Sequence, residues 1–537
     1  MNKEKKVGFI FSIIMIVLTC IIYKIRLEET YSISMLINKL SYSMQIRQIA
    51  ASYYLFILGY WLMPYVEPQW GMYRRIVFSY IVGTAIWGAL SILYLCVGIK
   101  YNLVNMTIGC IIVGGINHLL LKKNMIRKDL KSFLSDSFIF IGIASIASTG
   151  LMYTFGSCDS QYLIQQWGKD LAIMGVINER QHGLLTSTGI LPATFSSLSY
   201  FWGADNMYTI HHVLELCFWI FFGSAVGETI FFTDNISLKK RYLVSIFLTI
   251  FVYRLPPIQL LSGWIMSNMY MMVYSFVLCY FLYMDLEQKL MFCNKLYLYI
   301  IVGAITLLRT DSSITMCIIL GCFAICYSDQ VKKLFPFLVI AFFAFLSFYF
   351  KIYLVLKGDV DGMLINLRIL LLMGMCFWLI GCYMVVAKYI MKILKKTNII
   401  SILYCSLLIL NIGLFVVFKD TYVNNFIIIV KNMIDLSIIG GHWGSSLGIT
   451  VLCIFYIMSK REKQDVFFLL GVCSIVIYMD FGVIRTINDT VTAARFGFGD
   501  SMNRAIISTL PIIFFDFYRK LFSERFILKV SLGCKEY

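Results

Sequence analysis

The sequence predicts an all-α, polytopic membrane protein. Hydrophobic residues make up 60% of its 537 residues and charged residues only 14%, whereas a soluble protein has about 25% charged residues. Apolar runs of the roughly 20 residues that a helix needs to cross a bilayer recur along almost the whole chain. The polar hinges between these runs are short, so no separate water-soluble domain is expected. We predict a bundle of about 14 to 16 transmembrane helices with one large outer loop that carries interfacial helices.

The amino terminus predicts a retained membrane helix. Residues 1–24 combine a basic start, MNKEKK, with an apolar run, as a signal peptide does. No small-residue cleavage pattern follows, because the run leads into Tyr23, Lys24, Ile25 and Arg26. Residues 24–47 are interpreted either as an outer loop or as an interfacial helix.

The apolar runs place the predicted helices in order along the chain. Those before the long polar loop lie at 7–24, 50–66, 76–98, 102–121 and 136–155. Those after it lie at 209–232, 242–257, 259–284, 296–309, 312–328, 334–355, 366–388, 399–417, 446–459, 465–481 and 503–518. The two spans beside Pro256 and Pro257 are either separate or one re-entrant hairpin. The domain organisation that follows is an N-terminal module of about four helices at 1–135, a core at 136–520 with the outer loop 156–208, and a basic cytoplasmic tail at 521–537.

The basic residues predict the orientation of the chain. With the amino terminus inside, most of the 46 lysines and arginines fall in inner hinges such as 122–131 and 388–396. The net charge of +17 therefore reflects cytoplasmic loops and contacts with anionic lipid head groups, and no nucleic-acid partner is expected. We predict a multi-pass protein of the cell membrane with both termini in the cytoplasm. The chemically mixed hinges then lie on the outer face, which points to function there.

Metal and nucleotide sites are not indicated. The sixteen cysteines are scattered mostly through apolar segments, without a CxxC motif or a Cys/His cluster at zinc spacing. The sequence contains no P-loop, no GxGxxG after a strand, no HExxH and no GxSxG. We therefore expect neither a cofactor nor a metal.

The segment 156–216 is the longest interruption of the apolar pattern. Asp159 follows the end of an apolar helix by four residues, so its carboxylate is expected at the membrane surface. Apolar residues then recur at helical spacing from Gln161 to Met174, which predicts a helix along the interface. Asp159 or Ser160 could cap that helix. Capping and a chemical role for Asp159 are compatible, and both stay open.

Ionisable residues break the apolar pattern at two later outer hinges. Arg309 and Asp311 lie between two apolar runs, where charged groups usually face a cavity or a partner. The planar guanidinium suits a phosphate, whereas a local Arg309–Asp311 ion pair is the structural alternative. The second hinge carries Arg495, Asp500, Asn503 and Arg504 before the last predicted helix. An arginine at a helix start favours a nearby anion, either a lipid head group or a lipid-linked phosphate.

Two histidines begin the helix after the long loop. His211 and His212 precede Glu215 by about one turn, so one of them can share a helix face with it. The spacing differs from that of zinc helices, and hydrogen bonding in the core or to a substrate is the stronger interpretation. No role is predicted for His182 in the outer loop.

These segments together resemble the GT-C class of integral-membrane glycosyltransferases. The likeness rests on GSCDSQYLIQQW, GADNMYTIHHVLE, LLRTDS and GFGDSMNRAIISTLP, which look like segments of GT-C-like bacterial membrane proteins, and it covers roughly residues 140 to 520. The resemblance implies a GT-C-like helix bundle that transfers a sugar from a polyprenyl-phosphate donor on the outer face. The acceptor would be a glycan, lipid or protein of the cell envelope, and membrane lipids would surround the site.

The resemblance also implies roles for single residues. Asp159 matches the first-loop acid and would act as general base on the acceptor hydroxyl, with inversion at the sugar. Arg309, Arg495 and Arg504 would offset the charge of the departing phosphate. Substrate contacts are expected from Asp311, Asp500, Asn503, His211 and His212. Ser160 stands where the commoner pattern has a second acid, so no metal dependence is expected.

Two other function classes remain open. A polysaccharide polymerase or ligase would also use outer arginines and a large loop. A transporter or flippase for lipid-linked saccharides would need internal repeats and polar residues near the middle of the membrane, and no clear repeat is visible. The enzyme interpretation predicts instead a cavity beside Asp159 that opens sideways to the lipid.

Overall fold

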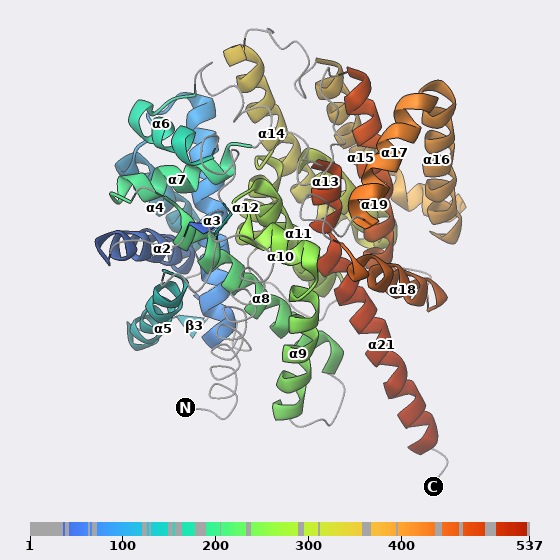
Figure 1. Ribbon diagram of the computed structural model, residues 1–537, viewed down its shortest axis with the longest axis horizontal. Coiled ribbons are helices and arrows are strands. Elements are labelled where there is room, and N and C mark those ends of the chain that lie inside the picture. The colour runs from blue at the N-terminus through green and yellow to red at the C-terminus, as the bar shows by residue number, and fades with distance from the viewer. Residues whose placement is uncertain are drawn as a thin grey trace. The chain divides into compact units, whose positions relative to one another are not determined.

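The computed structural model describes eighteen stretches of the chain, and all statements below concern them. They are residues 36–37, 42–62, 65–66, 72–120, 126–127, 130–148, 154–155, 164–177, 189–204, 206–231, 238–287, 295–309, 312–356, 367–393, 396–434, 443–460, 465–488 and 501–533. Within them the protein is helical, apart from two antiparallel pairs of two-residue strands (Figure 1). The prediction of an all-α protein is confirmed at this level.

The chain forms two compact units from interleaved segments. Unit 1 comprises Met1–Ser224, Ser262–Ser313 and Ile340–Asp359, and unit 2 comprises Ala225–Leu261, Ile314–Val339 and Val360–Tyr537. The modules predicted at 1–135, 136–520 and 521–537 follow one another along the chain, whereas the two units are interleaved. The division into modules stays a prediction.

Unit 1 is built on the long helices at the start of the chain and on two central ones. Its helices are α2 (Tyr42–Leu62), α3 (Met72–Val97), α4 (Leu103–Leu120), α5 (Leu130–Ser148), α6 (Trp167–Met174), α7 (Leu191–Phe201), most of α8 (Tyr208–Phe231), α11 (Ser267–Leu286), α12 (Leu296–Thr306) and the second part of α14 (Val331–Leu356). Its strands are β1 (Leu36–Ile37) paired with β4 (Thr154–Phe155), and β2 (Tyr65–Val66) paired with β3 (Ile126–Arg127).

Unit 2 holds most of the carboxyl-terminal half of the chain. Its helices are α9 (Leu238–Tyr253), most of α10 (Pro256–Gly263), α13 (Ser312–Cys326), the 3₁₀ turn η5 (Ser328–Gln330), the start of α14, α15 (Leu367–Ile393), α16 (Lys396–Val417), α17 (Lys419–Ile434), α18 (Ser445–Ser459), α19 (Val466–Asn488), α20 (Ser501–Ile507) and α21 (Leu510–Gly533).

The centre of unit 1 consists of α8 and α11, which are buried almost throughout. Their aromatic side chains interlock: the Phe221 and Phe276 rings lie edge to face, and Phe222 packs on Phe276 with ring centroids 5.0 Å apart. Such pairs add specific stabilisation beyond the burial of area. This aromatic core fixes α8 against α11, and the predicted histidines lie nearer the start of α8.

Two glycines allow the backbones of α2 and α3 to touch where these helices pack together, and Figure 1 shows α2 running across α3. A Cβ added at Gly59 would lie 1.7 Å from the Ser79 carbonyl oxygen, and one added at Gly83 would lie 1.8 Å from the Leu55 carbonyl oxygen. Small residues four apart on facing helices are typical of tight helix packing in membranes.

The helix α7 lies where the sequence predicted outer loop. Every residue from Leu191 to Ser199 is buried, and the Trp87 indole donates to the Thr194 carbonyl over 2.9 Å. Two of its hydroxyls return to backbone carbonyls, since Thr194 donates to Leu191 over 2.7 Å and Ser197 donates to Gly168 of α6 over 2.6 Å. Because these polar side chains are satisfied within the protein, a segment rich in serine and threonine can be buried.

Several helices are compatible with a multi-pass membrane protein. Among the described residues, five are long and apolar enough to cross a bilayer by length and composition: Tyr73–Val97, Tyr208–Glu228, Ser267–Leu286, Ser328–Ile352 and Ile399–Val417. A sixth crossing results if α9 and α10, which meet at a bend of 79°, form one span. Further apolar helices are shorter; α12 has 11 residues, about 17 Å of rise against a hydrocarbon core of about 30 Å. The count of about 14 to 16 spans stays a prediction.

The predicted helices are largely found, with two differences in how they are divided. The span predicted at 259–284 is split into α10 and α11, and the break near Pro256 and Pro257 is the bend described above. The span predicted at 503–518 is split at Ser508 and Thr509, and Pro511 lies in the first turn of α21, where its missing N–H costs nothing. The helix α17 was not predicted, and the first predicted span, 7–24, lies outside the described residues.

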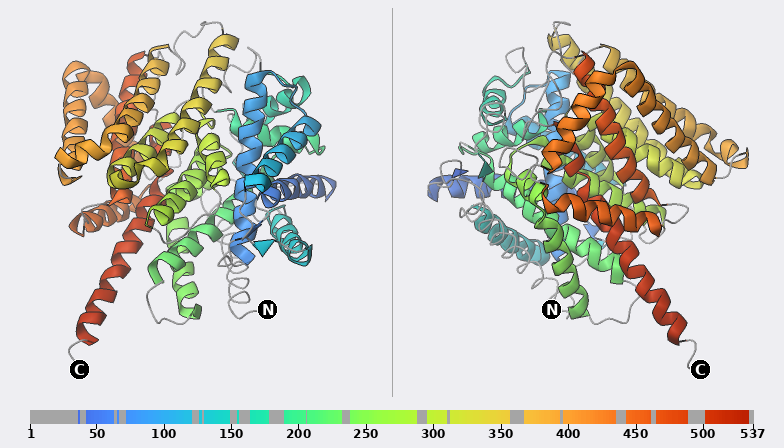
Figure 2. Two further views of the ribbon diagram at one scale, coloured as in Figure 1. Left: turned by 180° about the vertical axis from the view of Figure 1, so that it is seen from behind. Right: turned by 45° about the vertical axis from the view of Figure 1, so that its right-hand side comes forward.

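The last helix continues through the segment predicted as a basic tail. α21 extends from Leu510 to Gly533 without interruption (Figure 2). The boundary predicted at 520/521 is therefore not the end of the helix.

Candidate functional site

The start of α8 is held by a glutamine from α2. The buried Gln48 Oε1 accepts hydrogen bonds from the Thr209 backbone N–H over 3.0 Å and from the Thr209 hydroxyl over 2.5 Å, while Gln48 Nε2 donates to Asn206 Oδ1. A helix start leaves backbone N–H groups unpaired, and this side chain satisfies one of them. The position of His211, two residues further on, is therefore tied to α2.

His211 is a buried hydrogen-bonding residue of the core of unit 1. Its Nε2 lies 2.8 Å from the Ser262 carbonyl oxygen, and its Nδ1 lies 3.4 Å from the Tyr270 hydroxyl. A carbonyl only accepts, so Nε2 carries the proton, and Nδ1 of the neutral ring accepts from Tyr270. The imidazole thus connects α8 with the segment that joins α10 to α11.

His212 and Glu215 form the pair that the spacing allows. His212 Nδ1 lies 3.4 Å from Glu215 Oε2, three residues along α8, and both side chains are buried. The His211 and His212 rings meet edge to face with centroids 5.5 Å apart. Among the described residues no group of three or more His, Cys, Asp or Glu side chains could hold a metal ion.

Arg309 lies directly after α12 and is buried, with 3% of its surface exposed. Its Nη1 lies 3.4 Å from Ser267 Oγ and 3.5 Å from Asn268 Oδ1, the first two residues of α11. These distances are at the long limit for hydrogen bonds. The N-cap of α11, Met266, provides no side-chain cap, so the guanidinium lies beside an uncapped helix start.

Gly189 brings the end of the long polar segment against Arg309. It has a left-handed backbone with φ +84°, and a Cβ there would lie 2.1 Å from the Leu308 carbonyl oxygen and 2.8 Å from Arg309 Cγ. Further along this segment, the Phe195 ring stacks on Tyr270, with centroids 5.1 Å apart. We name this group the junction cluster: His211, His212, Glu215, Tyr270 and Arg309, arranged around the segment 262–270.

Two further predicted residues lie in unit 2. Asn503 in α20 is buried, and its Oδ1 accepts the Trp443 indole N–H over 2.5 Å. Arg504 follows it and is buried as well. They belong to a different unit from the junction cluster.

Four of the predicted site residues lie outside the described residues: Asp159, Asp311, Arg495 and Asp500. His182 also lies outside them. The helix predicted from Gln161 to Met174 is present in part, as α6 after a wider turn at 164–166, with Ile164 and Leu171 buried. Gln166, which directly precedes α6, has a helical backbone and makes no side-chain cap; Asp159 and Ser160 lie outside the described residues, so capping by either of them stays a prediction.

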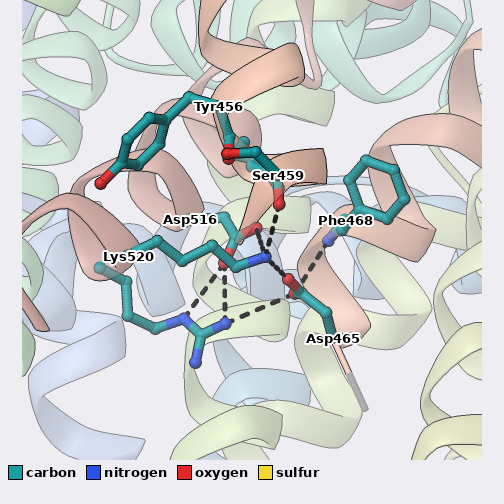
Figure 3. Close-up of polar contacts among 8 residues, drawn as sticks. Tyr456, Ser459, Asp465, Phe468, Asp516 and Lys520 are labelled. Carbon is teal, nitrogen blue, oxygen red and sulfur yellow. Dashed lines mark hydrogen bonds and ion pairs between the residues drawn. The ribbon is translucent and has the colours of Figure 1, made fainter. Parts of the chain in front are cut away.

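The densest group of charges is an ion cluster in unit 2, composed of Asp465, Asp516, Arg519 and Lys520 (Figure 3). Asp465 caps α19, since its Oδ1 accepts the Phe468 backbone N–H over 3.2 Å, and its Oδ2 pairs with the Lys520 ammonium. Two acids face two bases, so the charges balance without a ligand. We interpret this cluster as a tie between α19 and α21.

Sequence reasoning missed one acid in unit 2. Asp480 in α19 is buried and contacts Asn411 of α16, which in turn contacts Tyr422 of α17. The available signal was a polar residue inside an apolar run, Asn411 in LLILNIGLF and Asp480 at the end of SIVIYMD.

No known protein family, curated protein or solved structure matches the chain.

Proposed function

We propose that the protein transfers a sugar from a polyprenyl-phosphate donor to a cell-envelope acceptor at the outer face of the membrane, with the donor phosphate bound beside Arg309. One observation carries this proposal: the Arg309 guanidinium meets the uncapped amino-terminal end of α11 at Ser267 and Asn268. Both groups favour negative charge, the first through its fixed positive charge and the second through its backbone N–H groups and dipole.

The surroundings of Arg309 support a lipid-linked donor. The junction cluster lies among long apolar helices, two of which, α8 and α11, qualify as membrane spans by length and composition. A polyprenyl chain requires such surroundings, whereas a free sugar phosphate does not. His211 and Tyr270 hold the segment 262–270 in place, so their proposed role is to position the start of α11.

In the proposed reaction, the Asp159 carboxylate accepts the proton of the acceptor hydroxyl as the oxygen attacks the anomeric carbon. The bond from that carbon to the phosphate oxygen breaks, and the polyprenyl phosphate leaves as an anion. Arg309 offsets the developing charge on the phosphate. The roles expected for Arg495, Asp500 and Arg504 belong to this same proposal.

The binding step is tested with polyprenyl phosphate and the uncharged polyprenol of equal length. The full-length protein in lipid nanodiscs is mixed with each, and native mass spectrometry gives the bound fraction. We expect polyprenyl phosphate to bind at least tenfold more tightly, and Arg309→Gln to remove this preference, a change of about 1.4 kcal/mol. The control Arg254→Gln changes an exposed arginine in the turn after α9 and should leave the preference intact. Equal binding of both lipids contradicts the proposal.

The transfer step is tested with a panel of radiolabelled polyprenyl-phosphate sugars and envelope extracts as acceptors. Asp159→Asn should abolish transfer and leave the binding of polyprenyl phosphate unchanged. Binding without transfer from any donor by the unaltered protein would favour a lipid-linked-saccharide transporter. Transfer of preassembled chains instead of single sugars would identify a polymerase or ligase.

A further inference from the structure

Asp480 is a buried carboxylate in an apolar helix of unit 2. It follows the run FFLLGVCSIVIYM in α19, and 2% of its surface is exposed. Acidic residues in such surroundings are costly and usually serve a function. The function proposed above does not use Asp480.

Two neighbouring helices build a hydrogen-bonded trio with this carboxylate. Asn411 Nδ2 donates to Asp480 Oδ2 over 3.1 Å and to the Leu407 carbonyl oxygen over 2.9 Å. The Tyr422 hydroxyl donates to Asn411 Oδ1 over 2.7 Å. The tyrosine thereby fixes which end of the amide faces the acid, because its proton requires an acceptor. The trio joins α16, α17 and α19.

Among the residues that the structure describes, none donates a hydrogen bond to the second carboxylate oxygen, the buried Asp480 Oδ1. The helices α16, α17, α20 and α21 pack against α19, and α13 contacts it through a hydrogen bond between the Thr315 and Tyr478 hydroxyls. Tyr422 is the titratable group that faces Asp480 from α17, and Asn411 is the neutral one from α16.

The charges of α21 lie at the other end of α19. Asp516, Arg519 and Lys520 gather around Asp465, which precedes Asp480 by 15 residues, or about 22 Å of helix. They cannot neutralise Asp480 by contact.

A buried carboxylate without a cationic partner neutralises itself by taking up a proton. A hydroxyl left without an acceptor costs less than a bare charge, so the protonated acid suits this site. Hard cations such as Ca²⁺ take several oxygen ligands, and the described residues contain no cluster of three acidic, His or Cys ligands.

We propose that Asp480 is a proton-binding site, and that α16, α17 and α19 pack together around its protonated form. A proton from solvent adds to Oδ1, while Oδ2 keeps the hydrogen bond from Asn411. When the proton leaves, the carboxylate requires water, and α17 separates from α19. The polar residues Asp420 and Asn424 flank Tyr422 on α17 and are exposed, so water entering on their side has a short route to the trio.

The test uses the full-length protein in nanodiscs, with infrared spectroscopy and hydrogen exchange between about pH 5 and pH 9. At neutral pH we expect a carbonyl-stretch band of a protonated acid, which Asp480→Asn removes. As the pH rises, the opening equilibrium of α17 should increase by up to tenfold per pH unit, the slope for one proton. Asp480→Asn imitates the protonated acid and should abolish this dependence. The control Asp420→Asn changes an exposed acid of α17 and should leave it unchanged.

A second variant covers the case in which Asp480→Asn fails to fold. Asn411→Leu removes the donor to the carboxylate, so the acid should hold its proton to higher pH and the transition should move upward. An unchanged infrared band or pH profile in Asp480→Asn overturns the proposal. A second result would also overturn the proposal: sodium chloride, compared with potassium chloride at constant pH, stabilises the unaltered protein but not Asp480→Asn. That result would identify a cation site in place of a proton site.

Discussion

Gly189 shows how one residue can position a distant side chain. Its left-handed backbone and its contact with the Leu308 carbonyl oxygen leave no room for a Cβ. The residue joins the end of the long polar segment to the hinge that carries Arg309. The position of the guanidinium therefore depends on a residue that has no side chain.

We expect Gly189→Ala to destabilise the protein. The left-handed backbone alone costs roughly 1–2 kcal/mol for a residue with a Cβ, and the close contact adds to it. The melting temperature should fall, and binding of polyprenyl phosphate should weaken as Arg309 moves. The control Gly142→Ala in α5 meets no atom within 4 Å and should be neutral or stabilising by about 0.5–1 kcal/mol. Equal effects of the two substitutions would contradict this account.

The sequence identified several residues of the junction cluster but not how they meet. Charged and imidazole side chains that interrupt apolar runs drew attention to His211, His212 and Arg309. Their common neighbour, the segment 262–270, carries no unusual residue, and its role arises from the break between α10 and α11. Asp480 was missed because it stands at the end of its run, where a polar residue is expected to face water.

At the scale of elements, hydropathy predicted most helices because an apolar run leaves the backbone few alternatives. It predicted α4 and α8 to within a residue at each end, and the end of α3 to within a residue. It missed α7 and α17 for opposite reasons. α7 is buried but rich in hydroxyl groups that bond to nearby carbonyls, whereas α17 is amphipathic, with charged residues such as Lys419 and Lys431.

The contribution of the α2–α3 contact to stability can be tested by substitution. Gly83→Val should force the helices apart, because the Cβ would lie 1.8 Å from a backbone oxygen of α2. Overpacking of this kind costs about 1–3 kcal/mol, and the melting temperature should fall accordingly. The loss should extend to α8, because Gln48 of α2 holds its start, so hydrogen exchange near Thr209 should become faster.

The matched control is Gly115→Val in α4, where an added Cβ meets nothing within 4 Å. It introduces the same β-branched side chain into a helix without the contact. A similar loss of stability in both variants would show that valine acts through helix propensity, and the close packing of α2 on α3 would then contribute little.

At the scale of the whole molecule, the two units do not follow chain order. Unit 1 includes Ser262–Ser313 and Ile340–Asp359, although both segments follow the first residues of unit 2 in the sequence. Hydropathy reports where helices lie along the sequence and not which of them share a core. The consecutive modules expected from the sequence therefore could not anticipate this exchange of segments.

Topology offers the last prediction. The charge asymmetry predicts that both termini lie in the cytoplasm, and this would require an even number of crossings. The five helices that qualify singly give an odd number, whereas counting α9 and α10 as one span gives six. In a bacterial host, a green fluorescent protein fused to the carboxyl terminus should fluoresce, and alkaline phosphatase fused after Ile177 should be active. The same phosphatase fused after Lys240, in a predicted inner hinge, should be inactive. The reverse pattern would mean that both termini lie outside the cell. The predicted outer loop, 156–208, would then lie in the cytoplasm, where a donor at the outer face could not reach it.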